Sequence, residues 1–134
     1  MKQKVLFKHC DPAGIVFYPR YFEMMNDCVE AFFDEALQVP FETLHKSGNG
    51  SPTAQIETRF ARPSYHGDHL VLQLCLSRVG SRSATYRMKA LCANETRFDT
   101  TATLVHVDSD GKSTPWPDHM RSRMKEYEDQ LNDT

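Results

Sequence analysis

The segment His9–Phe22, HCDPAGIVFYPRYF, joins the first apolar run of the chain to its longest amphipathic segment. Asp11, Pro12 and Gly14 stand together, and because proline and glycine interrupt regular structure, a tight loop is expected here. Pro19 follows, and proline suits the first turn of a helix because its missing N–H would have no partner there. The segment therefore predicts a loop that carries a carboxylate into a helix N-terminus.

The residues after Pro19 have the spacing of an amphipathic helix that runs to about Leu37 and stops before Pro40. Its apolar side chains recur at steps of three and four, which is the helical period: Tyr21, Met25, Cys28, Val29, Phe32, Phe33 and Ala36. Residues 41–54 are expected to hold a short helical turn and then a loop. We interpret the Met and Phe pairs of the long helix as core, so the helix needs a sheet to cover it.

Four runs typical of β-strands follow, separated by connections short enough for antiparallel hairpins: residues 55–63, 69–79, 83–93 and 96–108. In the second run leucines occupy alternate positions from Leu70 to Leu76, which places them on one face of a strand. With a strand expected in residues 2–9, the chain has about five antiparallel strands and an α+β fold. Residues 115–134 are expected to form a loop and a charged surface helix.

The length of 134 residues fits one domain, residues 1–134. Its 16 basic and 18 acidic side chains give a net charge of -2, which offers no general attraction to nucleic acid. We expect a cytoplasmic protein without a membrane span, because the N-terminus has no signal-peptide core and the four cysteines are scattered. One sheet packed on one helix leaves an edge or face uncovered, so self-association is expected.

The predicted helix start offers a chemical role for Asp11. Helix N-termini carry free N–H groups and the positive end of the helix dipole, and both bind polarised carbonyls. Because Pro19 has no N–H, the free backbone donors at the helix start are those of Tyr18 and of the residues just after the proline. An ester or thioester carbonyl held there could react with Asp11 as nucleophile or as base for water. The alternative is that Asp11 only starts a turn, as Asp before Pro often does.

The stretch CDPAGIVFYPRYF, with the helix and strands that follow, resembles the 4-hydroxybenzoyl-CoA thioesterase branch of the hotdog-fold acyl-CoA thioesterases. Its pattern D-x-x-G-x-V-x-Y-x-x-Y is similar to the signature of that family, and the similarity extends over essentially the whole chain. The resemblance implies a hotdog fold, in which a five- to six-stranded antiparallel sheet wraps a long central helix. It also implies dimers formed by joined sheets, active sites at the dimer interface and, we expect, a homotetramer.

The resemblance further implies hydrolysis of an acyl-CoA or aryl-CoA thioester, with CoA as substrate and with neither a cofactor nor a metal. Asp11 would be the catalytic carboxylate, as nucleophile or general base, and the Tyr18 N–H would polarise the thioester carbonyl. Asn26 stands where the hydroxybenzoyl enzyme is expected to carry an acidic residue that meets the substrate phenol. Asn26 is therefore a candidate substrate contact, and the identity of the acyl group stays open.

A second group of candidates lies in the hairpin SRVGSRS. Arg78, Arg82 and Ser83 surround the position where the family places phosphate contacts of CoA, and arginine suits bidentate phosphate binding. The alternative is that these are solvated charges at a turn. No glycine-rich phosphate loop or nucleic-acid motif is present in the sequence.

Two other groups of residues contain types that can be catalytic or bind metal. His9, Cys10 and Asp11 contain the residue types of a catalytic relay, but neighbours on an extended segment point in opposite directions. His66 and His69 have no third residue at a spacing typical of metal ligands, so they are interpreted as part of a turn. Two rival functions stay open: a hydratase or dehydratase that pairs Asp11 with His9, and a non-catalytic acyl-CoA binding protein.

Overall fold

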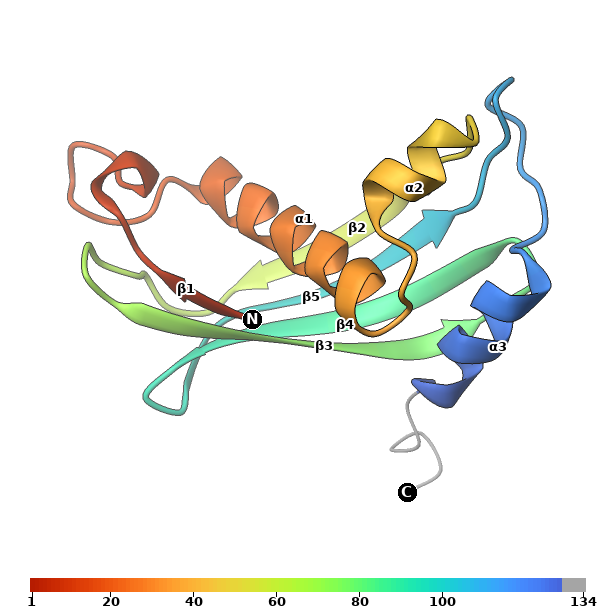
Figure 1. The fold of residues 1–134 in the computed structure, drawn as a ribbon. Coiled ribbons are helices and arrows are strands. Elements are labelled where there is room, and N and C mark those ends of the chain that lie inside the picture. Colours follow the sequence, from red (N-terminus) through yellow and green to blue (C-terminus); the bar gives the residue numbers. More distant parts are fainter. Residues whose placement is uncertain (129–134) are drawn as a thin grey trace.

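A computed structural model describes residues 1–128, in which one long helix lies across an antiparallel sheet (Figure 1). The five strands are ordered β1-β3-β4-β5-β2. They are β1 (Lys2–Lys4), β2 (Thr53–Phe60), β3 (His69–Val79), β4 (Ser83–Cys92) and β5 (Glu95–Val105). The helices are α1 (Tyr18–Glu35), α2 (Phe41–Lys46) and α3 (Asp118–Glu126), with a short 3-10 helix η1 (Phe7–His9) before α1.

The predicted α+β class and antiparallel pairing are correct. The consecutive strands β3, β4 and β5 form the expected hairpins. The hairpin expected between residues 55–63 and 69–79 is wrong, because β2 crosses to the far edge of the sheet and pairs with β5. The strand expected in residues 2–9 is shorter, because only Lys2–Lys4 pairs with β3. At residues 7–9 the chain turns into η1, where the His9 side chain takes up the Leu6 N–H that a strand would have used in its ladder.

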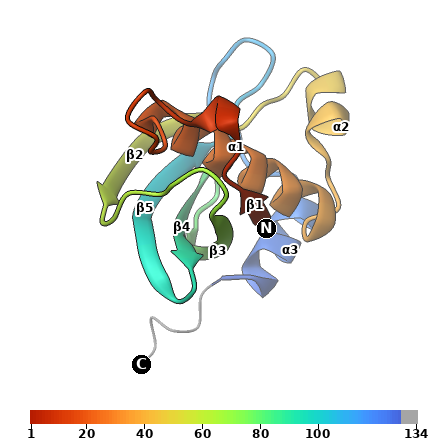
Figure 2. The ribbon, with the colours of Figure 1, turned by 90° about the vertical axis from the view of Figure 1, so that its left-hand side faces the viewer.

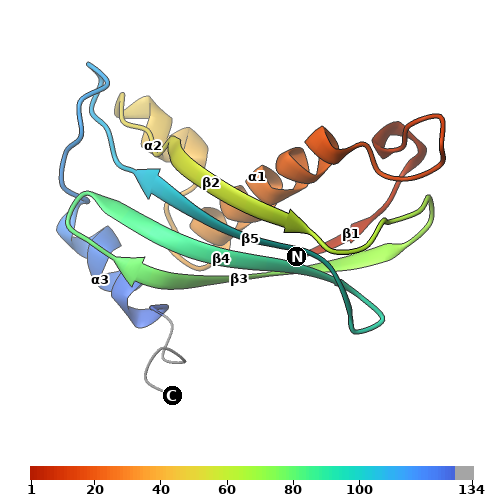
Figure 3. The same cartoon turned by 180° about the vertical axis from the view of Figure 1, so that it is seen from behind.

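The core lies between α1 and the concave face of the sheet, which curves around the helix (Figure 2). The predicted alternation in β3 is present, because Leu70 and Leu72 are buried while Val71 between them is exposed. Met24 and Met25 of α1 are both buried, as interpreted from the sequence. From behind, the strands lie in front of α1, and no helix of the described chain covers the middle of this outer face (Figure 3).

The C-terminal helix differs from the expectation of a surface helix. Met120 and Met124 of α3 are fully buried, and Trp116 just before the helix is buried as well. Arg123 donates two hydrogen bonds to the Ala36 carbonyl, at 3.2 and 2.8 Å. The two methionines lie four residues apart and form a buried stripe on one face of the helix. The charged residues between them made the segment look like a surface helix in the sequence. The last part of the predicted helix, residues 129–134, lies outside the described residues.

All four cysteines are free thiols, and Cys28 is buried while the other three are half-buried. Within residues 1–128, each helix is too short or too polar to span a membrane.

Candidate active site

Asp11 lies at the start of a tight hairpin that leads from η1 into α1. Its N–H donates to the Ile15 carbonyl at 2.9 Å, and its own carbonyl accepts the Gly14 N–H at 2.9 Å. Gly14 has a φ of +82°, a left-handed conformation that glycine adopts at little cost. The carboxylate Oδ1 accepts the Ala13 N–H at 2.9 Å, and the other oxygen makes no hydrogen bond with the described residues. Asp11 is therefore a turn former that keeps one carboxylate oxygen available.

Tyr18, the first residue of α1, has a backbone donor without a partner. The preceding Phe17 N–H donates to the His9 carbonyl at 2.9 Å. Pro19 has no N–H, and the Arg20 N–H donates to the Phe17 carbonyl at 2.9 Å. No side chain caps the helix, and the Tyr18 N–H makes no hydrogen bond within residues 1–128. The start of α1 is thus left with a free donor, at the positive end of the helix dipole.

A largely apolar groove of about 590 Å³ runs beside α1. One wall is α1, the other is formed by β2 and α2, and Tyr86 and Leu104 of the sheet lie between them. The residues that α1 contributes include the predicted substrate contact: Phe22, Met25, Asn26 and Val29. Asn26 is therefore the predicted substrate-binding residue that lies on this groove, whereas Asp11 and Tyr18 are not part of its lining.

The Tyr18 side chain lies on the face of α1 that also borders the groove. Tyr18 lies one turn before Phe22, and their ring centres are 6.4 Å apart. Phe60 of β2 packs edge-on against both rings, with centres 6.1 Å from each. These three aromatic rings form one cluster that connects the groove residue Phe22 to the first residue of the helix.

Tyr86 is a groove residue that the sequence analysis missed. Its side chain is 3% exposed, and its hydroxyl makes no hydrogen bond with the described residues. Burial, with a smaller effect from Cys28, raises the pKa of Tyr86 to about 12, so the phenol is neutral at pH 7. In the sequence, a tyrosine that alternates with apolar strand residues is typical of core, and nothing there marks its contact with a groove.

The predicted phosphate contacts lie at the other end of the sheet. The β3–β4 hairpin that carries Arg78, Arg82 and Ser83 is opposite the Asp11 hairpin (Figure 1), at the far end of a ten-residue strand that spans about 30 Å. Arg82 Nη1 donates to the Ser113 carbonyl at 2.7 Å, and the Ser83 backbone carbonyl accepts the Trp116 indole N–H at 3.1 Å. One chain therefore does not bring these residues together with Asp11.

The other constellations gain no support from the geometry. Nδ1 of the buried His9 accepts the Leu6 N–H at 2.9 Å, and the Cys10 thiol donates to the Leu6 carbonyl at 3.7 Å, so these side chains form no relay. His66 is exposed in the turn before β3, and His69 is exposed as the first residue of that strand. Residues 1–128 contain no cluster of three or more side chains able to hold a metal.

The comparison with family models decides the family. Residues 5–124 match the model described as the thioesterase-like superfamily. The chain belongs to this superfamily. The family resemblance recognised in the sequence is thereby confirmed at the level of the superfamily.

Known proteins of similar sequence and structure agree with this assignment. The 4-hydroxybenzoyl-CoA thioesterase of Pseudomonas sp. (strain CBS-3) is 27% identical over 89 residues. The match covers 65% of this chain and 63% of that protein, so it spans less than two thirds of the relative. A gentisyl-coenzyme A thioesterase has a TM-score of 0.86 at 22% identity, covering 92% of this chain and 98% of that chain.

A solved mutant of 4-hydroxybenzoyl-CoA thioesterase, complexed with 4-hydroxybenzoyl-CoA, has a TM-score of 0.85 at 21% identity. That match covers 92% of this chain and 96% of the other. These structural similarities confirm the predicted hotdog fold, here with a five-stranded sheet and a long helix.

Proposed function

We propose that this protein hydrolyses acyl-CoA or aryl-CoA thioesters to a carboxylic acid and free CoA. The observation that carries the proposal is the free Tyr18 N–H at the start of α1, in the same short segment as the Asp11 carboxylate and on the helix that forms one wall of the groove. A polarising donor, a carboxylate and an apolar groove are the parts that thioester hydrolysis requires. The named relatives, which are CoA thioesterases, support the same reaction.

In the proposed reaction, the thioester carbonyl oxygen accepts the Tyr18 N–H. Negative charge grows on this oxygen as the carbonyl carbon is attacked, so the N–H and the helix dipole stabilise the transition state more than the substrate. Asp11 acts by one of two routes. In the first, its carboxylate attacks the carbonyl carbon, expels the CoA thiolate and leaves an anhydride that water cleaves. In the second, it removes a proton from a water molecule that attacks the carbonyl carbon, and the C–S bond then breaks to release the CoA thiolate.

We propose an aromatic acyl group as the preferred substrate. The groove is lined mainly by apolar and aromatic side chains, and the relatives named above act on gentisyl-CoA and 4-hydroxybenzoyl-CoA. The mainly apolar walls carry a few polar groups, namely Asn26 and the unpaired hydroxyl of Tyr86 together with His45, Ser51 and Thr53. Such sparse polar groups in an apolar pocket fix the orientation of a ligand.

Self-association of the chain completes the proposal. Among the described strands β2 pairs only with β5, and seven of its eight residues are exposed, including Ile56 and Phe60. An exposed apolar edge strand favours pairing with a second copy. We propose a dimer joined along β2, two of which form a tetramer. Arg78, Arg82 and Ser83 of one chain would then contact the phosphates of CoA bound at a partner's Asp11, and no cofactor is needed.

The test is a thiol-release assay with short-chain, long-chain and aryl-CoA thioesters. Release of free CoA that is fastest with aryl thioesters is expected. Hydration of crotonyl-CoA without thiol release would instead identify a hydratase. Tight binding of acyl-CoA with no thiol released in a single turnover would identify a binding protein.

A further inference from the structure

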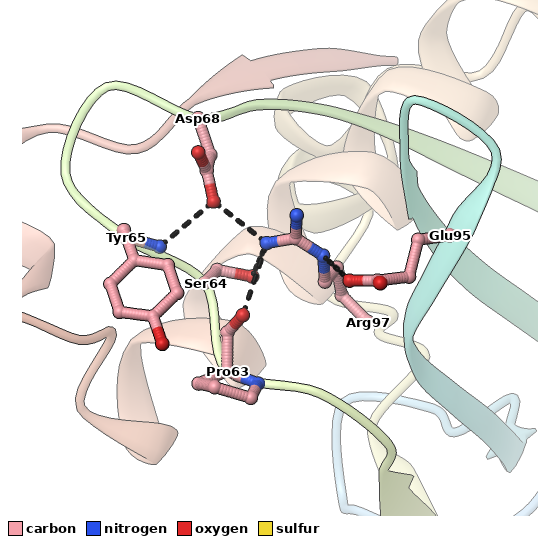
Figure 4. A network of polar contacts seen from close by, with 6 residues as sticks. All are labelled: Pro63, Ser64, Tyr65, Asp68, Glu95 and Arg97. Carbon is pink, nitrogen blue, oxygen red and sulfur yellow. Dashed lines mark hydrogen bonds and ion pairs between the residues drawn. The ribbon is translucent and has the colours of Figure 1, made fainter.

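Arg97 is the centre of a polar network that the proposed chemistry does not use (Figure 4). It is the extra residue of a bulge in β5. Phe98 pairs with Ala90 of β4, and the next pair is Thr96 with Leu91, so Arg97 is left outside the ladder with β4. A bulge re-aims a strand side chain, and the Arg97 side chain, only 11% exposed, points to the loop between β2 and β3.

The guanidinium of Arg97 makes several contacts with this loop. Its Nη1 donates to Asp68 Oδ2 at 2.7 Å, to the Pro63 carbonyl at 3.1 Å and to Ser64 Oγ at 3.3 Å. Its Nε lies 2.9 Å from Glu95 Oε1, in an ion pair on the strand side. Arginine suits this role because its planar fork presents several donors in a fixed geometry. The network therefore ties one loop to the rigid sheet.

Asp68 is the charged partner of Arg97 within the loop. Its side chain is 25% exposed, and its Oδ2 also accepts the Tyr65 N–H at 2.9 Å. Burial alone would raise the pKa of Asp68, but the hydrogen bonds from Tyr65 and Arg97 outweigh it and lower the pKa below its usual range. The carboxylate therefore stays ionised, and removal of Arg97 leaves it without its cation.

The same loop holds the Asp11 hairpin. Ser64, which is fully buried, accepts the Val16 N–H on its carbonyl at 2.9 Å, and Tyr65 forms an isolated β-bridge with Ile15. The Ile15 carbonyl in turn accepts the Asp11 N–H at 2.9 Å. An unbroken chain of contacts thus runs from Arg97 through the loop to the backbone of Asp11.

The geometry points to Arg97 as a positioning residue for Asp11. Through Ser64 and Asp68 it fixes the hairpin on which the Asp11 carboxylate faces a thioester held at the Tyr18 N–H. This inference rests on the proposed catalytic role of Asp11. Because a misplacement of about 1 Å can reduce a rate by about 10²-fold, loss of Arg97 acts on kcat more than on substrate binding.

The experiment compares four forms of the full chain: wild type, Arg97→Met, Asp11→Asn and the double variant, each assayed by thiol release well below its own melting temperature. Arg97→Met is expected to lower kcat about 10- to 100-fold with KM changed less than about threefold. In the double variant Arg97→Met adds less than about twofold to the loss caused by Asp11→Asn, because the residue it positions has already lost its charge. Arg97→Lys, which keeps the charge, recovers part of the rate.

Arg123→Met is the matched control. Arg123 also ties two elements together, by two hydrogen bonds to the Ala36 carbonyl, but at the other end of α1. It is expected to lower the melting temperature and leave kcat within about twofold of wild type. An unchanged kcat in Arg97→Met, or a loss of the same factor with and without the Asp11 carboxylate, overturns the inference about Arg97. Full activity of Asp11→Asn alone overturns the proposed role of Asp11 instead.

Discussion

Phe17 donates its backbone N–H to the His9 carbonyl at 2.9 Å, and this bond occupies the donor that comes directly before α1. The next residue, Tyr18, therefore offers the first free N–H at the head of the helix. In the same hairpin, Asp11 is held by its own backbone bond to Ile15. The backbone hydrogen bonds of Asp11 thus form the turn, while one oxygen of its carboxylate stays available for chemistry.

Asp11→Asn separates the two roles. Asparagine keeps a side-chain oxygen to accept the Ala13 N–H, so the turn and the melting temperature should stay near wild type. The charge that attacks or activates water is lost, so kcat is expected to fall about 10²- to 10⁴-fold with KM little changed. Steady-state thiol release and thermal unfolding measure the two effects. Retention of more than about a tenth of wild-type kcat would return Asp11 to a purely structural role.

Much of this site could be predicted from the sequence, because its signals are local. Pro19, Gly14 and the apolar period after them predicted the loop and the helix, which begins one residue before Pro19. That Asp11 lies in the loop leading into the helix follows from adjacency along the chain. The superfamily match confirms the family read from the same stretch.

The rest depends on contacts between distant residues. The crossover that pairs β2 with β5 and the bulge at Arg97 leave no local pattern, because register is decided by the partner strand. The alternation of β4 indicated that Tyr86 is core, but alternation does not say that a groove borders the side chain. The charged residues around Met124 indicated a surface helix, because the sequence does not show what covers its apolar side chains. Arg82 looked like a free cation, but its Nη1 donates to the Ser113 carbonyl.

Arg82→Ala tests the proposed phosphate contact. Loss of one charge-assisted contact far from the reacting carbon is expected to raise KM for a full CoA thioester roughly five- to fiftyfold, with kcat unchanged. The effect should vanish with a truncated thioester that lacks the nucleotide. Equal effects on both substrates would mean that Arg82 serves only to hold the Ser113 segment.

Ile56→Glu tests the proposed dimer along β2. Ile56 is 40% exposed on an edge strand, so a charge there is expected to disrupt pairing with a second copy and reduce the mass found by light scattering. Val71→Glu is the matched control, because Val71 is 38% exposed but lies on β3 inside the sheet, and it should leave the dimer intact. A monomeric wild type with full activity at nanomolar concentration would contradict the shared site.

His106 should make the fold sensitive to acid. Burial lowers the pKa of His106 below its usual value of 6.5, while its ring stacks on Trp116 with centres 4.7 Å apart. The unfolded chain then binds the proton more readily than the folded chain, so the free energy of unfolding falls as pH drops below about 6.5. Burial lowers the pKa of His9 as well, so His106→Gln should reduce this dependence without abolishing it.

Chemical denaturation at pH 7.5 and 5 measures the effect of His106→Gln. The exposed His119 provides the control. His119→Gln should leave the change in the free energy of unfolding between pH 7.5 and 5 as in wild type. If the free energy of unfolding changes equally between the two pH values in His106→Gln and in wild type, His106 is excluded as a source of the acid sensitivity.

Tyr86→Phe tests whether the groove recognises a substituent on an aromatic acyl group. The Tyr86 hydroxyl has no hydrogen-bond partner within residues 1–128, so its removal should leave the melting temperature unchanged or slightly higher. If the hydroxyl contacts the acyl group, kcat/KM for a hydroxybenzoyl-CoA should fall about three- to tenfold relative to benzoyl-CoA, the scale of one neutral hydrogen bond. Tyr21→Phe is the matched control, because the Tyr21 side chain is also buried but does not line the groove. Equal ratios of the two substrates in wild type, Tyr86→Phe and Tyr21→Phe would show that Tyr86 contributes shape and not polarity to the groove.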